Sequence, residues 1–193
     1  GFRNYDRVTF SNTATTSLAS DVATGRLEIG SGKTLTVNAQ NAGNVYDFNV
    51  DDNIEGVKAN LVIRGGASET KTSSTTVEGS VALDNLTLDK VHAVIKGHTE
   101  VTNTLAVQND ATLTLNSTSS IATLTVNDGM VTLGDKSSIN QLNVNNGGNA
   151  TVSAGPFNCS YNRISLRNRC SPLIFLCTGL DCNRKNLLST NRS

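Results

Sequence analysis

The chain has 193 residues, the length of a single domain, and its 16 acidic and 16 basic side chains cancel to a formal net charge of zero. This balance gives no reason to expect a nucleic-acid partner, which would require an excess of basic residues. No stretch approaches the roughly 18 continuous apolar residues of a membrane span, so insertion of this segment into a membrane is not expected. Residues 1–6 do not make a signal peptide, and we expect an excised fragment or a mature product without its export signal.

The composition disfavours helices. Thr, Asn, Ser, Val and Gly are abundant, and these residues are poor in helix interiors, whereas Thr and Val suit a pleated strand. The chain has only two Pro, no Trp, five Phe and three Tyr. An all-β fold with a narrow, aliphatic interior is therefore predicted.

The first predicted strands carry the pairs Leu27/Ile29 and Leu35/Val37. In each pair the apolar residues alternate with polar ones, and alternation places every second side chain on one face of a strand. The sequence between them, Gly30-Ser-Gly-Lys-Thr34, resembles the tail of a phosphate-binding loop. It leads into a strand and not into a helix N-terminus, so it is predicted to form a corner.

The densest acidic stretch follows, with Asp47, Asp51, Asp52 and Glu55. A calcium loop needs a D-x-D-x-D-G order that is absent here. Because the repeat is interrupted at this place, we predict a solvated loop that leaves the coil, with a metal site as the alternative. The other carboxylates that a polysaccharide-cleaving enzyme could use are Asp84, Asp89, Asp110, Asp128 and Asp135.

His92 and His98 are the only histidines that could act as a general base. Neither lies in a recognisable motif, and the chain has no G-x-S-x-G sequence to hold a strained nucleophile. Both are predicted to be exposed residues of the repeat, and catalysis by a serine is not expected.

From residue 105 to residue 152 the sequence repeats at intervals of 18 or 19 residues. The recurring pairs are Leu105/Val107, Leu124/Val126 and Leu142/Val144, then Leu113/Leu115 and Val131/Leu133, with Ile121 returning as Ile139. The pattern extends back to Leu86 and Leu88, which are followed eight residues later by Val94. Fixed self-similarity of this length is typical of a solenoid.

Among solenoids of this period, the parallel β-helix fits best. A leucine-rich horseshoe needs a fuller Leu pattern and a helical half, and no stretch has the apolar 3.6-residue spacing of a helix. In a parallel β-helix each turn of about 18–20 residues supplies two or three short strands, which pair with the next turn at roughly 4.8 Å. Residues 1–155 are therefore predicted to form a parallel β-helix of about 18–19 residues per turn and roughly eight turns.

The corners of this coil are predicted at Asn127-Asp-Gly129 and Asn145-Asn-Gly-Gly148, because Asn and Gly tolerate the left-handed backbone conformation. Asp110 and Asp128 lie one repeat apart at such positions, where Asp serves turn geometry without needing any chemistry.

The sequence changes character after Pro156. All four cysteines follow it, at Cys159, Cys170, Cys177 and Cys182, together with many arginines and an apolar run at residues 172–177. A disulfide cap or a metal knuckle is one interpretation, but the C-x-x-C pairs of zinc sites are absent. We favour the other: residues 156–193 are a non-repetitive tail, not native to the rod and poorly packed or disordered, although a capping segment would also break the pattern.

The cysteine-free, Thr- and Asn-rich coil from Ile121 to Gly148 resembles the passenger domains of Gram-negative autotransporters, the pertactin-like β-helices. The resemblance covers roughly residues 20–154. It implies a right-handed parallel β-helix that is exported, carried across the outer membrane by a C-terminal β-barrel, and displayed or released outside the cell. Lack of cysteine suits this route, because disulfides formed in the periplasm would hinder passage of an extended chain. The family includes adhesins and serine proteases whose catalytic domain sits on a β-helical stalk.

We therefore expect a non-enzymatic stalk or adhesin segment that mediates self-association or host-surface binding at the bacterial cell surface or in the extracellular space. The outward residues expected to make contacts are Thr112, Asn127, Thr132 and Asn145. No catalytic residue, cofactor or metal is expected. The alternatives are the stalk of a secreted serine protease and, third, a β-helical enzyme of the polysaccharide-lyase type.

Overall fold

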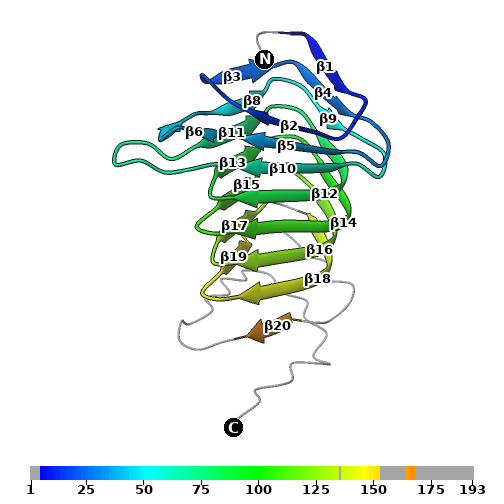
Figure 1. Ribbon diagram of the computed structural model, residues 1–193. Coiled ribbons are helices and arrows are strands. Elements are labelled where there is room, and N and C mark those ends of the chain that lie inside the picture. Colours follow the sequence, from blue (N-terminus) through cyan, green and yellow to red (C-terminus); the bar gives the residue numbers. More distant parts are fainter. Residues whose placement is uncertain (1–4, 135, 153–163, 168–193) are drawn as a thin grey trace.

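The computed structural model describes residues 5–134, 136–152 and the backbone of residues 164–167. These residues form a β-solenoid of about eight turns, in which successive turns pair in parallel along one axis (Figure 1). The predicted all-β parallel β-helix is confirmed. Every element assigned within these ranges is a strand, and this part of the chain has no helix that could span a membrane.

Each turn has three faces, and the first two belong to one 11-stranded sheet. The first face begins with β1 (Arg7–Phe10), β4 (Arg26–Ile29) and β9 (Ile54–Glu55). The second face begins with β2 (Ala14–Ser17), β5 (Thr34–Asn38) and β10 (Asn60–Arg64). From residue 81 onward one long strand per turn covers both faces: β12 (Val81–Asp89), β14 (Thr99–Gln108), β16 (Ser119–Asn127) and β18 (Ser137–Asn145).

The third face is a seven-stranded sheet. Its strands are β3 (Val22–Thr24), β8 (Phe48–Val50), β11 (Ser74–Val77), β13 (His92–Ile95), β15 (Thr112–Leu115), β17 (Met130–Leu133) and β19 (Asn149–Val152). A short strand, β20 (Ile164–Arg167), pairs in parallel with β18. The rest of the predicted tail, with all four cysteines, lies outside the described residues, as does Asp135.

The register of the strands confirms the repeat between residues 105 and 152. The stacked positions are Leu105, Leu124 and Leu142; Val107, Val126 and Val144; and Ile121 with Ile139. All of these side chains are buried. Since full burial of an aliphatic side chain contributes roughly 1.5–3 kcal/mol, the columns are the main source of stability along the rod.

The two early strands lie on other faces of the turn than the later pairs with the same eight-residue spacing. Leu27 lies on the first face, in β4, whereas Leu35 lies on the second face and stacks on Leu61 in β10. The eight-residue interval between Leu27 and Leu35 therefore crosses a different corner from the interval between Leu105 and Leu113. Alternation alone identifies a strand but not the face to which it belongs.

Val94 was expected on an inward position, and this is wrong. Val94 pairs with Thr114 and lies partly exposed, while Ala93 stacks on the buried Leu113. The segment between β12 and β13 is one residue shorter than the corresponding segment between β14 and β15. That difference shifts every inward position of β13 by one residue.

A column of left-handed residues forms the corner between the second and third faces. Lys90, Asn109, Asp110, Asp128 and Asn146 have φ angles between 49° and 62°. Among residues with a side chain, Asn and Asp adopt this conformation most readily. The predicted corners at residues 127–129 and 145–148, and the turn role of Asp110 and Asp128, are confirmed.

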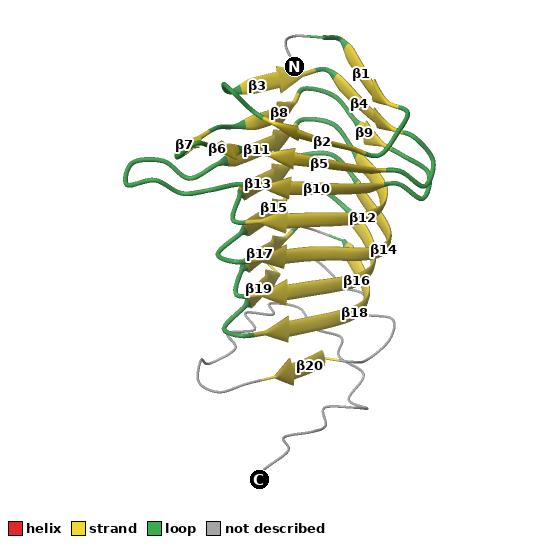
Figure 2. Cartoon of the chain, in the orientation of Figure 1, coloured by secondary structure: helices red, strands yellow, loops and turns green. Residues whose placement is uncertain are grey.

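The acidic stretch at residues 47–55 does not leave the coil, so that prediction is wrong. It contributes β8 and β9, which pair with β3 and β4 of the preceding turn. The strand β8 was not predicted because most residues of this stretch are polar. Phe48 and Val50 are fully buried, and they alternate with exposed or partly exposed neighbours. The chain instead leaves the coil just before, in a hairpin of β6 (Gln40–Asn41) and β7 (Asn44–Val45), and again at residues 65–73 (Figure 2).

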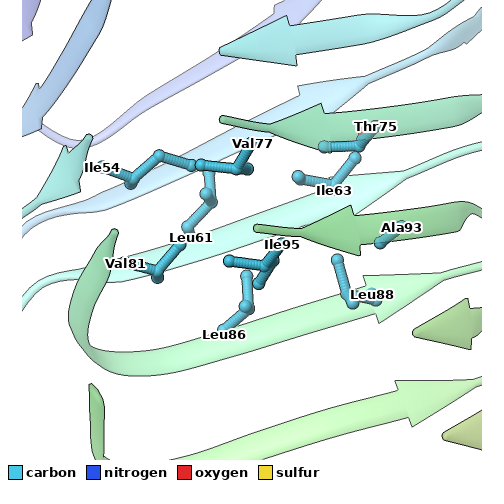
Figure 3. Close-up of a pocket in the computed structure, with 10 residues that line it drawn as sticks. All are labelled: Ile54, Leu61, Ile63, Thr75, Val77, Val81, Leu86, Leu88, Ala93 and Ile95. Atoms are coloured by element: carbon cyan, nitrogen blue, oxygen red, sulfur yellow. The ribbon is translucent and has the colours of Figure 1, made fainter. Parts of the chain in front are cut away.

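A small cavity of about 10 Å³ lies in the interior beneath β9 to β13. Figure 3 shows aliphatic side chains from all three faces around it, together with Thr75, whose hydroxyl has no partner among the described residues. A single water needs roughly 10–15 Å³, so this is a packing gap and not a ligand site.

Candidate functional site

The outward side chains of the second and third faces form two uncharged surfaces in the later turns. The second-face grid consists of Thr104, Ala106, Gln108, Thr123, Thr125, Asn127, Gln141, Asn143 and Asn145. The third-face grid consists of Thr112, Thr114, Met130, Thr132, Asn149 and Thr151. Neighbouring rows of each grid are separated by the strand spacing of about 4.8 Å. Each grid therefore presents hydroxyl and amide groups at a regular interval.

Thr112 and Thr132, both predicted as contact residues, lie on the third-face grid. Their neighbours Leu113 and Val131 are buried, so the two threonines point outward. Thr112 pairs with Met130, whereas Thr132 pairs with Thr114. The two threonines therefore lie in adjacent turns but in different columns.

Asn127 and Asn145, the other predicted contact residues, lie on the second-face grid as direct neighbours in one column. Asn146 Nδ2 donates a hydrogen bond of 2.6 Å to Asn127 Oδ1. The amide of Asn127 is thus tied to the corner of the next turn. The left-handed corner at Asp128 separates this column from the third face.

Both histidines are exposed, as predicted. His92 begins β13 on an outward position, and Nδ1 of His98 lies 2.7 Å from Thr118 Oγ1. The phosphate-loop-like sequence at residues 30–34 is a corner, also as predicted. Its backbone N–H groups already donate hydrogen bonds within the coil: that of Gly32 to Val57 O, that of Lys33 to Gly30 O, and that of Thr34 to Thr13 Oγ1.

Two of the acidic residues singled out in the sequence, Glu55 and Asp89, make contacts between neighbouring turns. On the first face Arg26 Nη2 lies 2.7 Å from Glu55 Oε1, and this carboxylate raises the pKa of Arg26. Asp89 accepts hydrogen bonds from Asn109 at 2.7 Å and from Gln108 at 3.3 Å. Within residues 5–134 and 136–152 no three His, Cys, Asp or Glu side chains gather in a way that could hold a metal ion.

Lys71 forms a clamp that the sequence did not reveal. Its Nζ lies 2.9 Å from Asp21 Oδ1 and 2.9 Å from Asp47 Oδ2, which belong to two different turns. Each carboxylate also accepts a backbone N–H from the following turn, Asp21 from Asp47 and Asp47 from Ser74. Hydrogen bonds from Lys71 and from the N–H of Asp47 hold the pKa of Asp21 below its ordinary value. The same carboxylates, Asp21 first, raise the pKa of Lys71.

The clamp belongs to a projection formed by residues 40–45 and 65–73, here named the double loop (Figures 1 and 2). The two loops come from successive turns and meet at their bases. Ser73, which is buried, donates a hydrogen bond of 3.1 Å to Ala39 O and accepts one of 3.1 Å from the Gly66 N–H. A Cβ on Gly66 would come within 2.4 Å of Gln40 Oε1, so a larger residue there would require the Gln40 side chain to move.

Two sequence signals could have located the double loop. The turns that contain its two parts are longer: Thr34 and Asn60 are 26 residues apart, and Asn60 and Asn85 are 25 apart. The corresponding residues Asn85 and Thr104 of the next turn are only 19 apart. The segment Asn41-Ala-Gly-Asn44 is a turn signal as well, and Ala42 and Gly43 have φ angles of 49° and 80°. The extra length in these turns marks the insertions.

Three buried hydroxyls stack inside the corner where the first face begins. Thr99 pairs with Ser119, and Ser119 with Ser137. Ser137 donates to Gly134 O at 3.0 Å, whereas Thr99 Oγ1 and Ser119 Oγ have no partner among the described residues. This column is sealed from solvent and is part of the interior.

Comparison with known proteins gives no match, either to protein-family models, to curated proteins or to solved structures.

Proposed function

We propose that this chain is a non-enzymatic stalk or adhesin segment of a surface-displayed or secreted protein of the autotransporter type, and that it associates with a second copy of itself or with a host surface. The observation that carries the proposal is the pair of uncharged grids on the second and third faces. They present mostly hydroxyl and amide groups in successive turns, on a rod whose interior is mainly aliphatic.

Such a grid can bind through many weak contacts. One hydrogen bond contributes about 0.5–1.5 kcal/mol net, so a single pair of amides gives little affinity. Two rods aligned along their axes would repeat the contact at every turn, and linked contacts strengthen each other through effective concentration. The column of Asn127 and Asn145 offers this repetition directly, since the two residues are neighbours in register.

The engagement of the carboxylates supports a non-enzymatic role. Asp47 is held in the Lys71 clamp, Asp89 accepts two side-chain hydrogen bonds, and Asp110 and Asp128 occupy left-handed corners. These four carboxylates therefore have structural roles in the coil. The absence of cysteine before residue 159 fits passage through an oxidising periplasm and supports the proposed extracellular location.

The test is sedimentation equilibrium of the purified chain, together with binding to epithelial cells and matrix material. The double variant Asn127→Glu/Asn145→Glu places two like charges in one column of the second-face grid. Its matched control, Ser120→Glu/Ser138→Glu, places them in one column of the first face. We expect the first variant to lose association or binding and the control to retain it. A wild-type chain that neither self-associates nor binds cells or matrix would overturn the proposal.

A further inference from the structure

The double loop contains more chain than its corner requires. At the same corner in later turns, only residues 90–91 separate β12 from β13, and only residues 128–129 separate β16 from β17. In the two turns of the double loop, residues 39–47 separate β5 from β8, and residues 65–73 separate β10 from β11. The coil itself therefore does not explain these insertions.

The double loop is nevertheless held in one conformation. Ser73 joins its two parts, Lys71 fixes the second part to two turns of the coil, and Asn41 Nδ2 donates to Leu18 O at 3.4 Å. Within the second part, the N–H of Lys71 donates to Ser68 Oγ at 3.1 Å. Fixing one residue's backbone costs roughly 1–2 kcal/mol, and a loop that is already ordered does not pay this cost again when it binds.

The exposed tips of the double loop are polar and almost uncharged. They present Asn44 from the hairpin and Glu69 and Thr70 from the second part, all exposed. No hydrogen bond of the Asn44 or Thr70 side chain occurs within the described structure, so both groups face solvent with their bonding capacity unused. The tips thus offer an amide, a hydroxyl and one carboxylate.

This chemistry argues against several classes of partner. The large apolar side chains exposed among the described residues are Tyr5, Val57 and Met130, and none lies on the double loop, which therefore lacks what a lipid surface requires. The cation of the double loop, Lys71, is occupied by two carboxylates. A polyanion such as a nucleic acid or a sulfated polysaccharide would find no opposite charge at the tips and would meet Glu69.

We infer that the double loop is a binding site for a neutral, hydroxyl-rich ligand, an uncharged glycan. The inference rests on the function proposed above and names the part of the rod that contacts a host surface. Asn44 and Thr70 supply hydrogen bonds to sugar hydroxyls, Glu69 accepts from them, and Lys71 and Ser73 hold the tips in place without touching the ligand.

The test is binding of the full chain to an array of neutral oligosaccharides, with the sialylated and sulfated forms of the same sugars in parallel. The tip variant Asn44→Ala/Thr70→Ala leaves the clamp and Ser73 intact. Its control is Ser120→Ala/Ser138→Ala, which removes two hydroxyls from one column of the first face, outside both grids and the double loop. We expect wild-type binding to neutral sugars, a loss of at least tenfold in the tip variant, and no loss in the control, with unchanged thermal unfolding in both.

Three results overturn the inference: no oligosaccharide is bound, the charged forms bind more tightly than their neutral parents, or the tip variant binds like the wild type. Self-association and cell binding of the same proteins separate this inference from the proposed function. If the tip variant still binds cells while Asn127→Glu/Asn145→Glu does not, the double-loop site fails and the stalk or adhesin function stands. If the wild type does neither, both fail.

Discussion

The turns formed by residues 5–80, here called the upper turns, differ from the lower turns formed by residues 81–152. In the lower turns one continuous strand covers the first and second faces, and only a shift of register, such as that between Leu83 and Asn85, marks the bend. In the upper turns separate strands meet at corner loops, and two of those turns carry the double loop. The lower turns repeat regularly, whereas the upper turns contain the interrupted strands and the double loop.

The pairing between turns differs in the same way. In the lower turns all residues of β13 pair with residues of β15. Between β8 and β11 the register contains a single pair, Val50 with Val77. There Asp47 Oδ1 and Asn49 Oδ1 accept the N–H groups of Ser74 and Thr76, each at 2.9 Å. Side chains thus replace backbone carbonyls where the double loop inserts, which makes this junction depend on particular residues.

Charge pairing follows the same division. The ion pairs of Arg7, Arg26 and Lys71 all lie in the upper turns, and Lys96 with Glu78 joins the two regions. Exposed ion pairs contribute little stability, typically about 0–1 kcal/mol. In the upper turns they join neighbouring strands of the first face and fix the double loop, while the lower turns rely on aliphatic columns and amide or hydroxyl neighbours.

The largest expected effect is in the lower turns, from Leu124→Asp. Leu124 is fully buried in a column between Leu105 and Leu142, so the substitution removes a core side chain and buries an unpaired carboxylate. We expect a loss of at least about 5 kcal/mol in the free energy of unfolding, because both costs add. Since each turn contacts only its neighbours, the adjacent turns should unfold with it. Chemical denaturation followed by circular dichroism measures the loss.

The control is Thr125→Asp, one residue along the same strand but on the second-face grid. Its side chain faces outward, so a carboxylate there stays in water, and we expect a change within about 0.5 kcal/mol. Equal small effects of the two substitutions would mean that the inward assignment, and with it the register of the repeat, is incorrect.

A smaller effect separates two buried serines, one from each region. In the upper turns Ser73→Ala removes a hydroxyl that both donates to Ala39 O and accepts from Gly66. The buried Gly66 N–H is then left without a partner, whereas Ala39 O keeps the hydrogen bond from the Tyr46 N–H at 2.8 Å. We expect a loss of about 1–3 kcal/mol. In the lower turns Ser119→Ala removes a buried hydroxyl that has no partner among the described residues, and stability should stay the same or rise slightly.

Thermal unfolding of both serine variants measures the two changes in stability. If Ser119→Ala costs as much as Ser73→Ala, the hydroxyl column of Thr99, Ser119 and Ser137 is a bonded network like that at the base of the double loop. The upper and lower turns would then not differ in how their buried hydroxyls are hydrogen-bonded.

The lower turns were predictable from sequence for a physical reason. A strand has a period of two, and stacking imposes the same residues at the same place in each turn, so Leu105, Leu124 and Leu142 record the register directly. The corners were predictable as well, because the left-handed conformation restricts Asp128 and Asn146 to a few residue types. Local rules were sufficient in both cases.

The upper turns were only partly predictable. The faces of Leu27 and Leu35 depend on which corner lies between them, and the sequence does not mark that. The Lys71 clamp joins residues 50 positions apart, so no local pattern contains it. The four contact residues predicted on the grids, Thr112, Asn127, Thr132 and Asn145, are outward or half-buried in the structure, and their binding role stays a prediction.

The smallest expected effect concerns the Lys71 clamp and its pH dependence. The pKa of Asp21 is lowered from 3.8 in the folded chain, so the clamp contributes stability above that pH and loses it as the pH falls through the folded value. The pKa of Lys71 is raised from 10.5, so its contribution is complete below that pH and disappears as the pH rises through the folded value. Lys71→Met removes the second effect and the largest cause of the first, since the Asp47 N–H still bonds Asp21, and it nearly preserves the aliphatic stem.

The two charged side chains remain substantially exposed, at 35% for Lys71 and 61% for Asp21, so solvent screens the pair. We therefore expect Lys71→Met to lower stability at pH 7 by no more than about 1 kcal/mol, and to flatten the decline of stability below pH 3.8 and above pH 10.5. Lys96→Met is the matched control, because it removes an exposed ion pair with Glu78 outside the double loop. Hydrogen exchange of the Asp47 and Ser74 amides gives the local readout. Faster exchange in Lys71→Met but not in Lys96→Met supports a clamp that orders the upper turns, whereas unchanged exchange in both would reduce it to an incidental surface ion pair.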